Sequence, residues 1–122
     1  MSGILTDNIG RSSGLVKAAA AGGETKCNIN FVGTGTISIN QSKNVASITD
    51  NGTGDTTINW DTDFANANFI WAWSAEENTS GNQVTTYGDD VTTAAGSLRF
   101  TTRIGASAVD MDKVSVIAQG AQ

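Results

Sequence analysis

The sequence has no histidine, and this absence excludes several kinds of chemistry. Without an imidazole, neither a Ser-His-Asp triad nor a Cys-His pair can form, and the commonest zinc ligand is missing. The single cysteine, Cys27, cannot form an internal disulfide, so the fold must be stable without covalent cross-links. Among the common hydrolase mechanisms, one that uses two carboxylates remains open.

Acidic residues are the candidates for such a mechanism, and their surroundings argue against it. They occur in three close pairs, Asp61 with Asp63, Glu76 with Glu77, and Asp89 with Asp90. Each pair lies among residues that favour turns, which is typical of solvated loops. The sequence therefore predicts no catalytic residue and a protein that is not an enzyme. A carboxylate-based depolymerase that acts through Asp89 and Asp90 is the enzymatic alternative.

Motifs for metals and cofactors are incomplete in this sequence. Asp61 and Asp63 have the spacing of the first two EF-hand ligands, but Ala65 stands at the third position and the required glycine is absent. Gly33-Thr34-Gly35 matches the start of a dinucleotide-binding fingerprint, yet Ser38 takes the place of its third glycine. We therefore expect no cofactor and no metal, with a looser surface calcium site as the alternative.

Charge and hydropathy limit the partners. Seven Lys and Arg against twelve Asp and Glu give a net charge of −5, which disfavours binding to a phosphate backbone. No stretch approaches the roughly 20 apolar residues that a membrane span needs, and the N-terminus lacks the pattern of a secretory signal. We expect no nucleic-acid partner, no membrane span, and synthesis in the cytoplasm.

Small polar residues dominate the composition. Sixteen Thr, 11 Ser, 11 Asn and 14 Gly make up 52 of the 122 residues, while 16% are charged and none is proline. Thr packs well on a pleated sheet, and Gly and Asn adopt the backbone angles of turns. This mixture predicts an all-β protein.

The first 24 residues differ from the rest. Their apolar residues are sparse and are followed by a short alanine run and the Gly22-Gly23 pair, at which a segment would end. We predict a short N-terminal attachment arm over residues 1–24, with at most a short helix that needs docking for stability. Residues 25–122 are predicted to form one domain. The apolar residues expected to attach the arm are Ile4, Leu5, Ile9, Leu15 and Val16.

From Thr25 onward, apolar residues alternate with polar ones, as in half-buried strands. The rows expected to face inward are Cys27-Ile29-Phe31, Ile37-Ile39, Thr56-Ile58-Trp60, Leu98-Phe100-Thr102-Ile104 and Val114-Val116-Ala118. A further strand is expected over Val45–Thr49. The Asn51-Gly52 pair predicts a tight hairpin. With a shorter strand near residues 83–87, about eight strands at regular spacing predict a jelly-roll-like antiparallel β-sandwich.

Residues 68–75 form a predicted strand with apolar side chains on both faces. Such a strand lies centrally in a sheet or in a subunit interface. We expect its aromatic row, Phe69, Trp71 and Trp73, to belong to the core or to an interface. Trp60 lies near a strand end and is the better candidate for a solvent-facing platform for a sugar ring, although a structural role is favoured there too.

Three segments suggest a family: GTGT at residues 33–36, NVASITDNGTGD at 44–55 and FANANF at 64–69. The run from Phe31 to Phe69 that contains them resembles a module of tail-fibre and related virion proteins of tailed bacteriophages, particularly those of marine and cyanobacterial hosts. Trp60 and Thr56 stand where this module more often has Phe and Tyr. The strands near the C-terminus fit more loosely, and the opening MSGILTDNIG looks like the attachment end of such proteins.

The resemblance implies a structural or adhesive virion component without catalytic activity. Fibres of this kind are typically homotrimers, and an apolar face on the isolated domain gives a physical reason for assembly. We expect a short tail-fibre or receptor-binding module that forms homotrimers, with the strand over 68–75 at the interface. The alternative is a capsid decoration (head fibre) or connector protein that its arm anchors to another virion protein.

Two predicted loops, over residues 76–82 and 88–90, are candidates for contact with a host receptor such as a surface glycan. Their polar residues are Glu76, Glu77, Asn78, Asp89 and Asp90.

Overall fold

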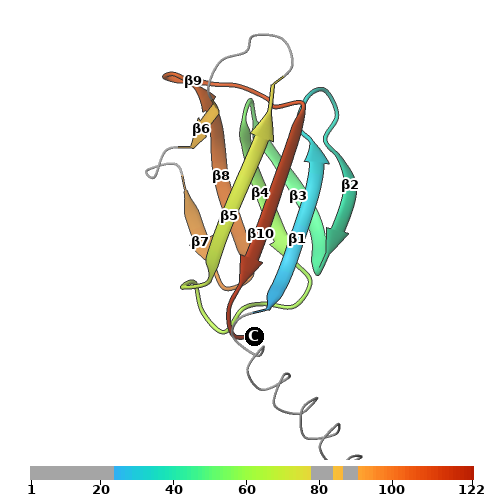
Figure 1. Ribbon diagram of the computed structural model, residues 1–122, viewed down its shortest axis with the longest axis vertical. Helices are drawn as coiled ribbons and strands as arrows, with labels where there is room; N and C mark the ends of the chain where they lie inside the picture. The colour runs from blue at the N-terminus through green and yellow to red at the C-terminus, as the bar shows by residue number, and fades with distance from the viewer. Residues whose placement is uncertain (1–23, 78–83, 87–90) are drawn as a thin grey trace, which may run out of the picture.

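Two antiparallel sheets packed face to face make up the domain (Figure 1). The computed structural model describes residues 24–77, 84–86 and 91–122. Its strands are β1 (Thr25–Val32), β2 (Ser38–Lys43), β3 (Val45–Gly52), β4 (Asp55–Trp60), β5 (Ile70–Glu76), β6 (Val84–Thr86), β7 (Thr92–Ala94), β8 (Ser97–Ile104), β9 (Ser107–Ala108) and β10 (Lys113–Gln119). Residues 1–23 of the predicted arm, which include its five attachment residues, lie outside the described residues. Within the described part, no helix has the length and apolar character to cross a bilayer.

The first sheet has the strand order β2-β1-β10-β5 and lies in front in Figure 1. The second has the order β3-β4-β8-β6, and β7 and β9 also pair with β8. The predicted all-β sandwich is therefore confirmed, while the jelly-roll topology stays a prediction. β7 and β9 are only three and two residues long and were not predicted.

The core lies between the sheets, and its rows follow the predicted alternation. In the first sheet, Ile29 pairs with Val116, which pairs with Trp73 of β5. In the second sheet, Ile58 pairs with Leu98. Alternate residues of β4 and β10 are buried as predicted, because successive side chains of a strand point to opposite faces.

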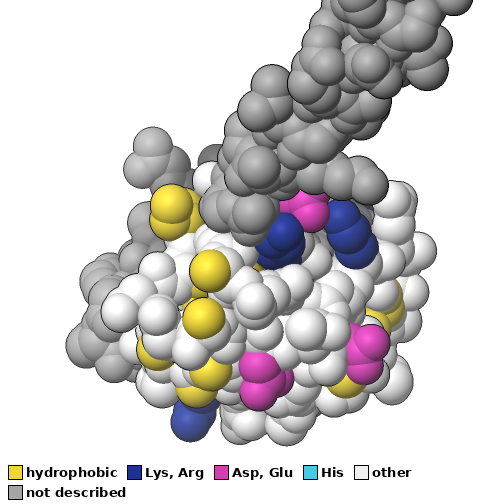
Figure 2. Space-filling view, turned by 90° about the horizontal axis from the view of Figure 1, so that it is seen from below, with side chains coloured by type: hydrophobic (Ala, Val, Ile, Leu, Met, Phe, Trp, Pro, Cys, Tyr) yellow, Lys and Arg dark blue, Asp and Glu magenta, His cyan; other side chains and the backbone are white. Residues whose placement is uncertain are grey.

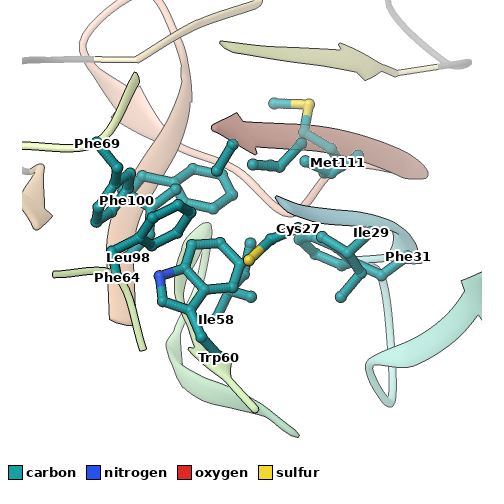
Figure 3. Close-up of a cluster of buried hydrophobic side chains, with 13 residues drawn as sticks. Cys27, Ile29, Phe31, Ile58, Trp60, Phe64, Phe69, Leu98, Phe100 and Met111 are labelled. Carbon is teal, nitrogen blue, oxygen red and sulfur yellow. The ribbon is translucent and has the colours of Figure 1, made fainter. Parts of the chain in front are cut away.

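Aromatic rings close the lower end of the sandwich, where the C-terminus lies in Figure 1. Trp60 meets Phe64 and Phe69 edge to face, with ring centroids 5.9 Å apart in both pairs (Figure 3). The loop between β4 and β5 is held by backbone bonds from Phe64 N–H to the Ala95 carbonyl and from Ala65 N–H to the Ala121 carbonyl. Trp60 is 4% exposed, so the favoured structural role of this residue is confirmed and the alternative of a solvent-facing platform is wrong.

Glycines allow close backbone contacts at the upper end. Gly33 N–H donates to the Met111 carbonyl at 2.9 Å, and a Cβ on Gly33 would lie 2.8 Å from that oxygen. Gly54 adopts φ +69° and packs against the backbone of Thr102 and Val109. Its N–H donates to Asp110 Oδ1 at 2.7 Å. These contacts join the β3–β4 hairpin to β8 and to the segment before β10.

Three local predictions need correction. The hairpin between β3 and β4 forms, but Gly52 pairs with Asp55, so Thr53 and Gly54 occupy its tip instead of Asn51 and Gly52. Ile39 was predicted to face inward, but it is 41% exposed. It lies on the edge strand β2, of which every residue is exposed. The strand over 68–75 begins at Ile70 and lies at the edge of its sheet in the described part, so the alternative of a central position is wrong and that of a subunit interface stays a prediction.

Candidate functional site

The aromatic row that we assigned to the core or an interface faces inward. Phe69 is buried, and Trp71 and Trp73 are half-buried against the core. The Trp71 ring lies 5.9 Å from the Phe100 ring of the opposite sheet. These three side chains therefore take part in the packing of their own domain, and their contact with a second copy stays a prediction.

The predicted receptor loops are described only in part. Glu76 ends β5 at the upper end, and its Oε2 lies 3.6 Å from Nζ of Lys113, with both side chains more than half exposed. Glu77 follows it and is half-buried. The remaining predicted loop residues, Asn78, Asp89 and Asp90, lie outside the described residues. Their recognition of a glycan stays a prediction.

The described acidic residues do not converge on one point. Asp61 and Asp63 are exposed in the lower loop, and the Asp63 carboxylate lies against the backbone at Gly96. Asp55 lies on β4, in the second sheet, with its side chain paired to Arg99. Among the described residues, no group of three or more His, Cys, Asp or Glu side chains comes close enough to hold a metal ion.

Asp55 and Arg99 form the strongest described ion pair. Arg99 Nε and Nη2 donate to the two carboxylate oxygens of Asp55 at 2.9 and 2.6 Å, across the β4–β8 pair. These charge-assisted hydrogen bonds, with the positive charge of Arg99, lower the pKa of Asp55. The pair joins neighbouring strands on the outer side of the second sheet, so its role is structural.

Cys27 is the only described residue with a thiol nucleophile, and it is fully buried. Its Sγ accepts a hydrogen bond from Asn44 Nδ2 at 3.1 Å. Burial raises the pKa of the thiol, and this effect is larger than the opposite effect of the hydrogen bond from Asn44. A buried thiol with a raised pKa is a poor nucleophile, so Cys27 acts as a core residue.

An extended surface that is uncharged at its centre lies on the outward side of the first sheet, and we call it the outer face. Its central residues come from all four strands: Asn28, Asn30, Gln41, Ala72, Ser74, Ser115 and Ile117. Asn30 Nδ2 donates to Ser115 Oγ at 2.7 Å, and Asn40 Nδ2 donates to Asn30 Oδ1 at 2.8 Å. Small side chains and paired amides make this face flat and uncharged at its centre.

Ile117 stands at the middle of the outer face, and shallow hollows surround it. One of 160 Å³ lies toward the lower end, between β10 and β5, and its apolar walls include Ile70, Ala72 and Ala118. Two others, of 250 and 220 Å³, lie higher on the face, and Ser115 lines both. Ile117 is 51% exposed and Ile70 is 65% exposed, the two highest values among exposed large hydrophobic residues in the described part.

This surface was not predicted, although the sequence contains a signal for it. Ile117 interrupts the polar positions of β10, where Lys113 and Ser115 share its face. Ile70 and Ala72 likewise put apolar groups on the outward side of β5. An apolar residue in the outward row of an alternating strand marks an exposed patch, which on a soluble domain often serves for binding or assembly.

No family model, curated protein or solved structure matches this chain.

Proposed function

We propose that this chain is a structural protein of a bacteriophage virion, a short tail-fibre or receptor-binding module that forms homotrimers. The main support for this proposal is that the two ends of the domain differ in role. Thr25, which joins the domain to the predicted arm, lies at the lower end, whereas Glu76 and Glu77 lie at the upper end (Figure 1). A module anchored at one end and exposed at the other suits attachment to a particle and contact with a host glycan.

The segments that resemble the phage module have framework roles here. Gly33 contacts the segment before β10, and Asn44 adopts φ 57° and accepts the Thr62 N–H at 2.7 Å. Phe64 and Phe69 stack at the lower end. A resemblance carried by framework positions supports a shared β-sandwich scaffold, on which exposed loops are free to differ in what they bind.

Assembly through β5 is supported by its position and surface. It is the last strand of the first sheet in the described part of the chain, and edge strands present backbone groups that pair with other chains. Among its outward residues, Ser74 lies outside the hollow that Ile70 and Ala72 line, and it is exposed and uncharged. Contact with neighbouring copies in a closed ring would cover both features.

Sedimentation of the full chain at micromolar concentration tests the assembly. We expect a trimer, and we expect Ser74→Lys to shift it to monomers by placing three like charges in the interface. Ser42→Lys, on β2 at the opposite edge of the same sheet, is the matched control and should stay trimeric. A wild-type chain that sediments as a monomer would contradict the proposed assembly.

Host recognition is tested separately by binding of the purified chain to a panel of bacterial surface polysaccharides. Replacement of residues 76–82 and 88–90 by Gly and Ser should abolish binding without loss of folding. The capsid-decoration alternative makes a different prediction. Removal of residues 1–24 should then release a folded domain from phage particles, while the loop variant should still be incorporated.

A further inference from the structure

The hollow between β10 and β5 at the lower end of the outer face has the character of a docking site for aliphatic side chains. The hollow has a volume of 160 Å³. For comparison, an apolar protein cavity of about 150 Å³ accommodates benzene. Ile70 and Ile117 line the hollow and are both more than half exposed. No charged residue lines this hollow. Hydrophobic side chains gather on one side of this end of the molecule (Figure 2).

The chain enters the domain beside this hollow. Thr25, the first residue of β1, lines the hollow together with Gln119 of β10. Because neighbouring strands lie about 4.8 Å apart, the distance from β1 across β10 to β5 is about 10 Å. The residues before Thr25 are therefore tethered within a short reach of an apolar surface that nothing in the described residues covers.

The preceding sequence supplies matching side chains at a suitable distance. Leu15 and Val16 are followed by the alanine run over 18–21 and then by Gly22 and Gly23. Four residue steps from Ala21 to Thr25 span up to about 13 Å when extended, which exceeds the distance to β5. Two glycines allow the chain to reverse direction before β1, because glycine adopts backbone angles that other residues avoid.

We propose that Leu15 and Val16 dock in this hollow of their own chain. The tether gives these side chains an effective concentration in the millimolar range or above, so a shallow site suffices to hold them. Docking covers Ile70 and Ile117. It also divides the predicted arm into two functional parts. Leu15 and Val16 orient the arm against the domain, and Ile4, Leu5 and Ile9 remain for contact with another virion protein.

Disulfide trapping in the full chain tests this docking directly. Val16→Cys combined with Ala72→Cys should form a disulfide within one chain. Val16→Cys with Gln41→Cys is the matched control, because Gln41 lies on the same face one strand away from β1 on the other side. The rate of oxidation should be about tenfold higher for the Ala72 pair. Cys27 is fully buried and should not interfere.

Equal oxidation rates for the two pairs would overturn the proposal, and so would a disulfide that forms between chains. A second readout is the fluorescence of the apolar dye anilinonaphthalene sulfonate. Leu15→Ser combined with Val16→Ser should increase dye binding, whereas Ile4→Ser with Leu5→Ser should leave it unchanged; equal dye binding in the two variants would overturn the docking. A monomeric wild-type chain would contradict trimer assembly and still leave this docking measurable.

Discussion

The ring of Phe64 stacks on the ring of Phe69, with centroids 4.5 Å apart and an interplanar angle of 21°. Phe64 comes from the loop after β4, whereas Phe69 lies just before β5, so the stack joins two segments that enter opposite sheets. A Cβ on Gly120 would lie 3.2 Å from the Phe69 Cβ, which shows how closely the C-terminal segment packs on this pair. The lower end is therefore closed by aromatic packing.

This packing predicts a large loss of stability when one ring is removed. Phe64→Ala should reduce the free energy of unfolding by about 3–5 kcal/mol, since it deletes a buried ring and leaves a cavity. Phe64→Leu retains most of the apolar volume and should cost less than about 1.5 kcal/mol. Urea denaturation followed by tryptophan fluorescence measures both. Equal values for the two variants would show that the lower end is not packed as described.

Trp60 offers a more selective test of the same cluster. Its Nε1 is buried and has no hydrogen-bond partner among the described residues. An unsatisfied buried donor costs about 1–3 kcal/mol, and this offsets part of the packing that the indole provides. Trp60→Phe should therefore change the free energy of unfolding by less than about 1 kcal/mol, because the lost apolar contact and the removed donor oppose each other.

Trp60→Ala is the reference for this prediction and should cost about 3–5 kcal/mol. Chemical denaturation of the two variants gives the comparison. If Trp60→Phe is as costly as Trp60→Ala, the indole N–H has a hydrogen-bond partner such as an ordered water. In that case the nitrogen contributes to stability.

Most strands of this domain can be predicted from its sequence, because the alternation of apolar and polar residues indicates which face of a strand is buried. Val114, Val116 and Ala118 are buried as predicted, and so are Ile58 and Trp60. The outward surface is harder to predict. Whether Ile117 contributes to a patch depends on which strands lie beside it, and the pairing of β10 with β1 and β5 joins segments far apart in sequence. Alternation within a single strand carries no information on that order.

The hairpin illustrates a second limit of sequence reasoning. Asn51-Gly52 is the strongest local turn signal, yet Asn51 Nδ2 donates to Thr57 Oγ1 at 2.7 Å, and a register shift occurs beside it. The tip moves to Thr53 and Gly54, where Gly54 reaches the backbone of β8. A tertiary contact thus accompanies the choice between Gly52 and Gly54, which are two positions apart, and local propensity contains no information on such a contact. The alternative of Trp60 as a platform is excluded by a tertiary contact too, since the packing of Phe64 and Phe69 buries this residue in its favoured structural role.

Gly54 and Gly35 form a matched pair for testing this contact. Both have positive φ, at +69° and +62°, so alanine is strained at either position. A Cβ on Gly54 would lie 2.7–2.9 Å from backbone atoms of Thr102 and Val109, whereas a Cβ on Gly35 would meet nothing within 4 Å. Gly35→Ala should cost about 1 kcal/mol from backbone strain alone. Gly54→Ala should cost more than about 2 kcal/mol, because backbone atoms of two strands must also shift.

Thermal or urea unfolding of the two alanine variants measures this difference. Equal costs would mean that the β3–β4 hairpin does not pack on β8 as described. A cost at Gly35 close to zero would leave the argument for Gly54 intact, since the difference between the variants tests the contact.

The Asp55–Arg99 pair makes part of the stability depend on pH. The pKa of Asp55 is below its ordinary value in the folded protein, chiefly because Arg99 donates hydrogen bonds to the carboxylate. A lowered folded pKa means that the stabilisation is fully present above the unfolded pKa and is lost as the pH falls through the folded pKa. The Arg99 side chain is 52% exposed, so solvent limits the contribution to about 1 kcal/mol or less.

Asp55→Asn should therefore lower the free energy of unfolding at about pH 7 and lower it less at about pH 2, because the wild-type carboxyl takes up a proton as the pH falls through its lowered pKa. Arg99→Gln should reproduce this pH dependence, because the hydrogen bonds from Arg99 are the main cause of the lowered pKa. The double variant at about pH 7 should lose less stability than the two single losses added together, since both remove the same ion pair. Urea unfolding at the two pH values measures all three variants. An Asp55→Asn loss that is the same at both pH values would show that the carboxylate charge does not stabilise the β4–β8 pair.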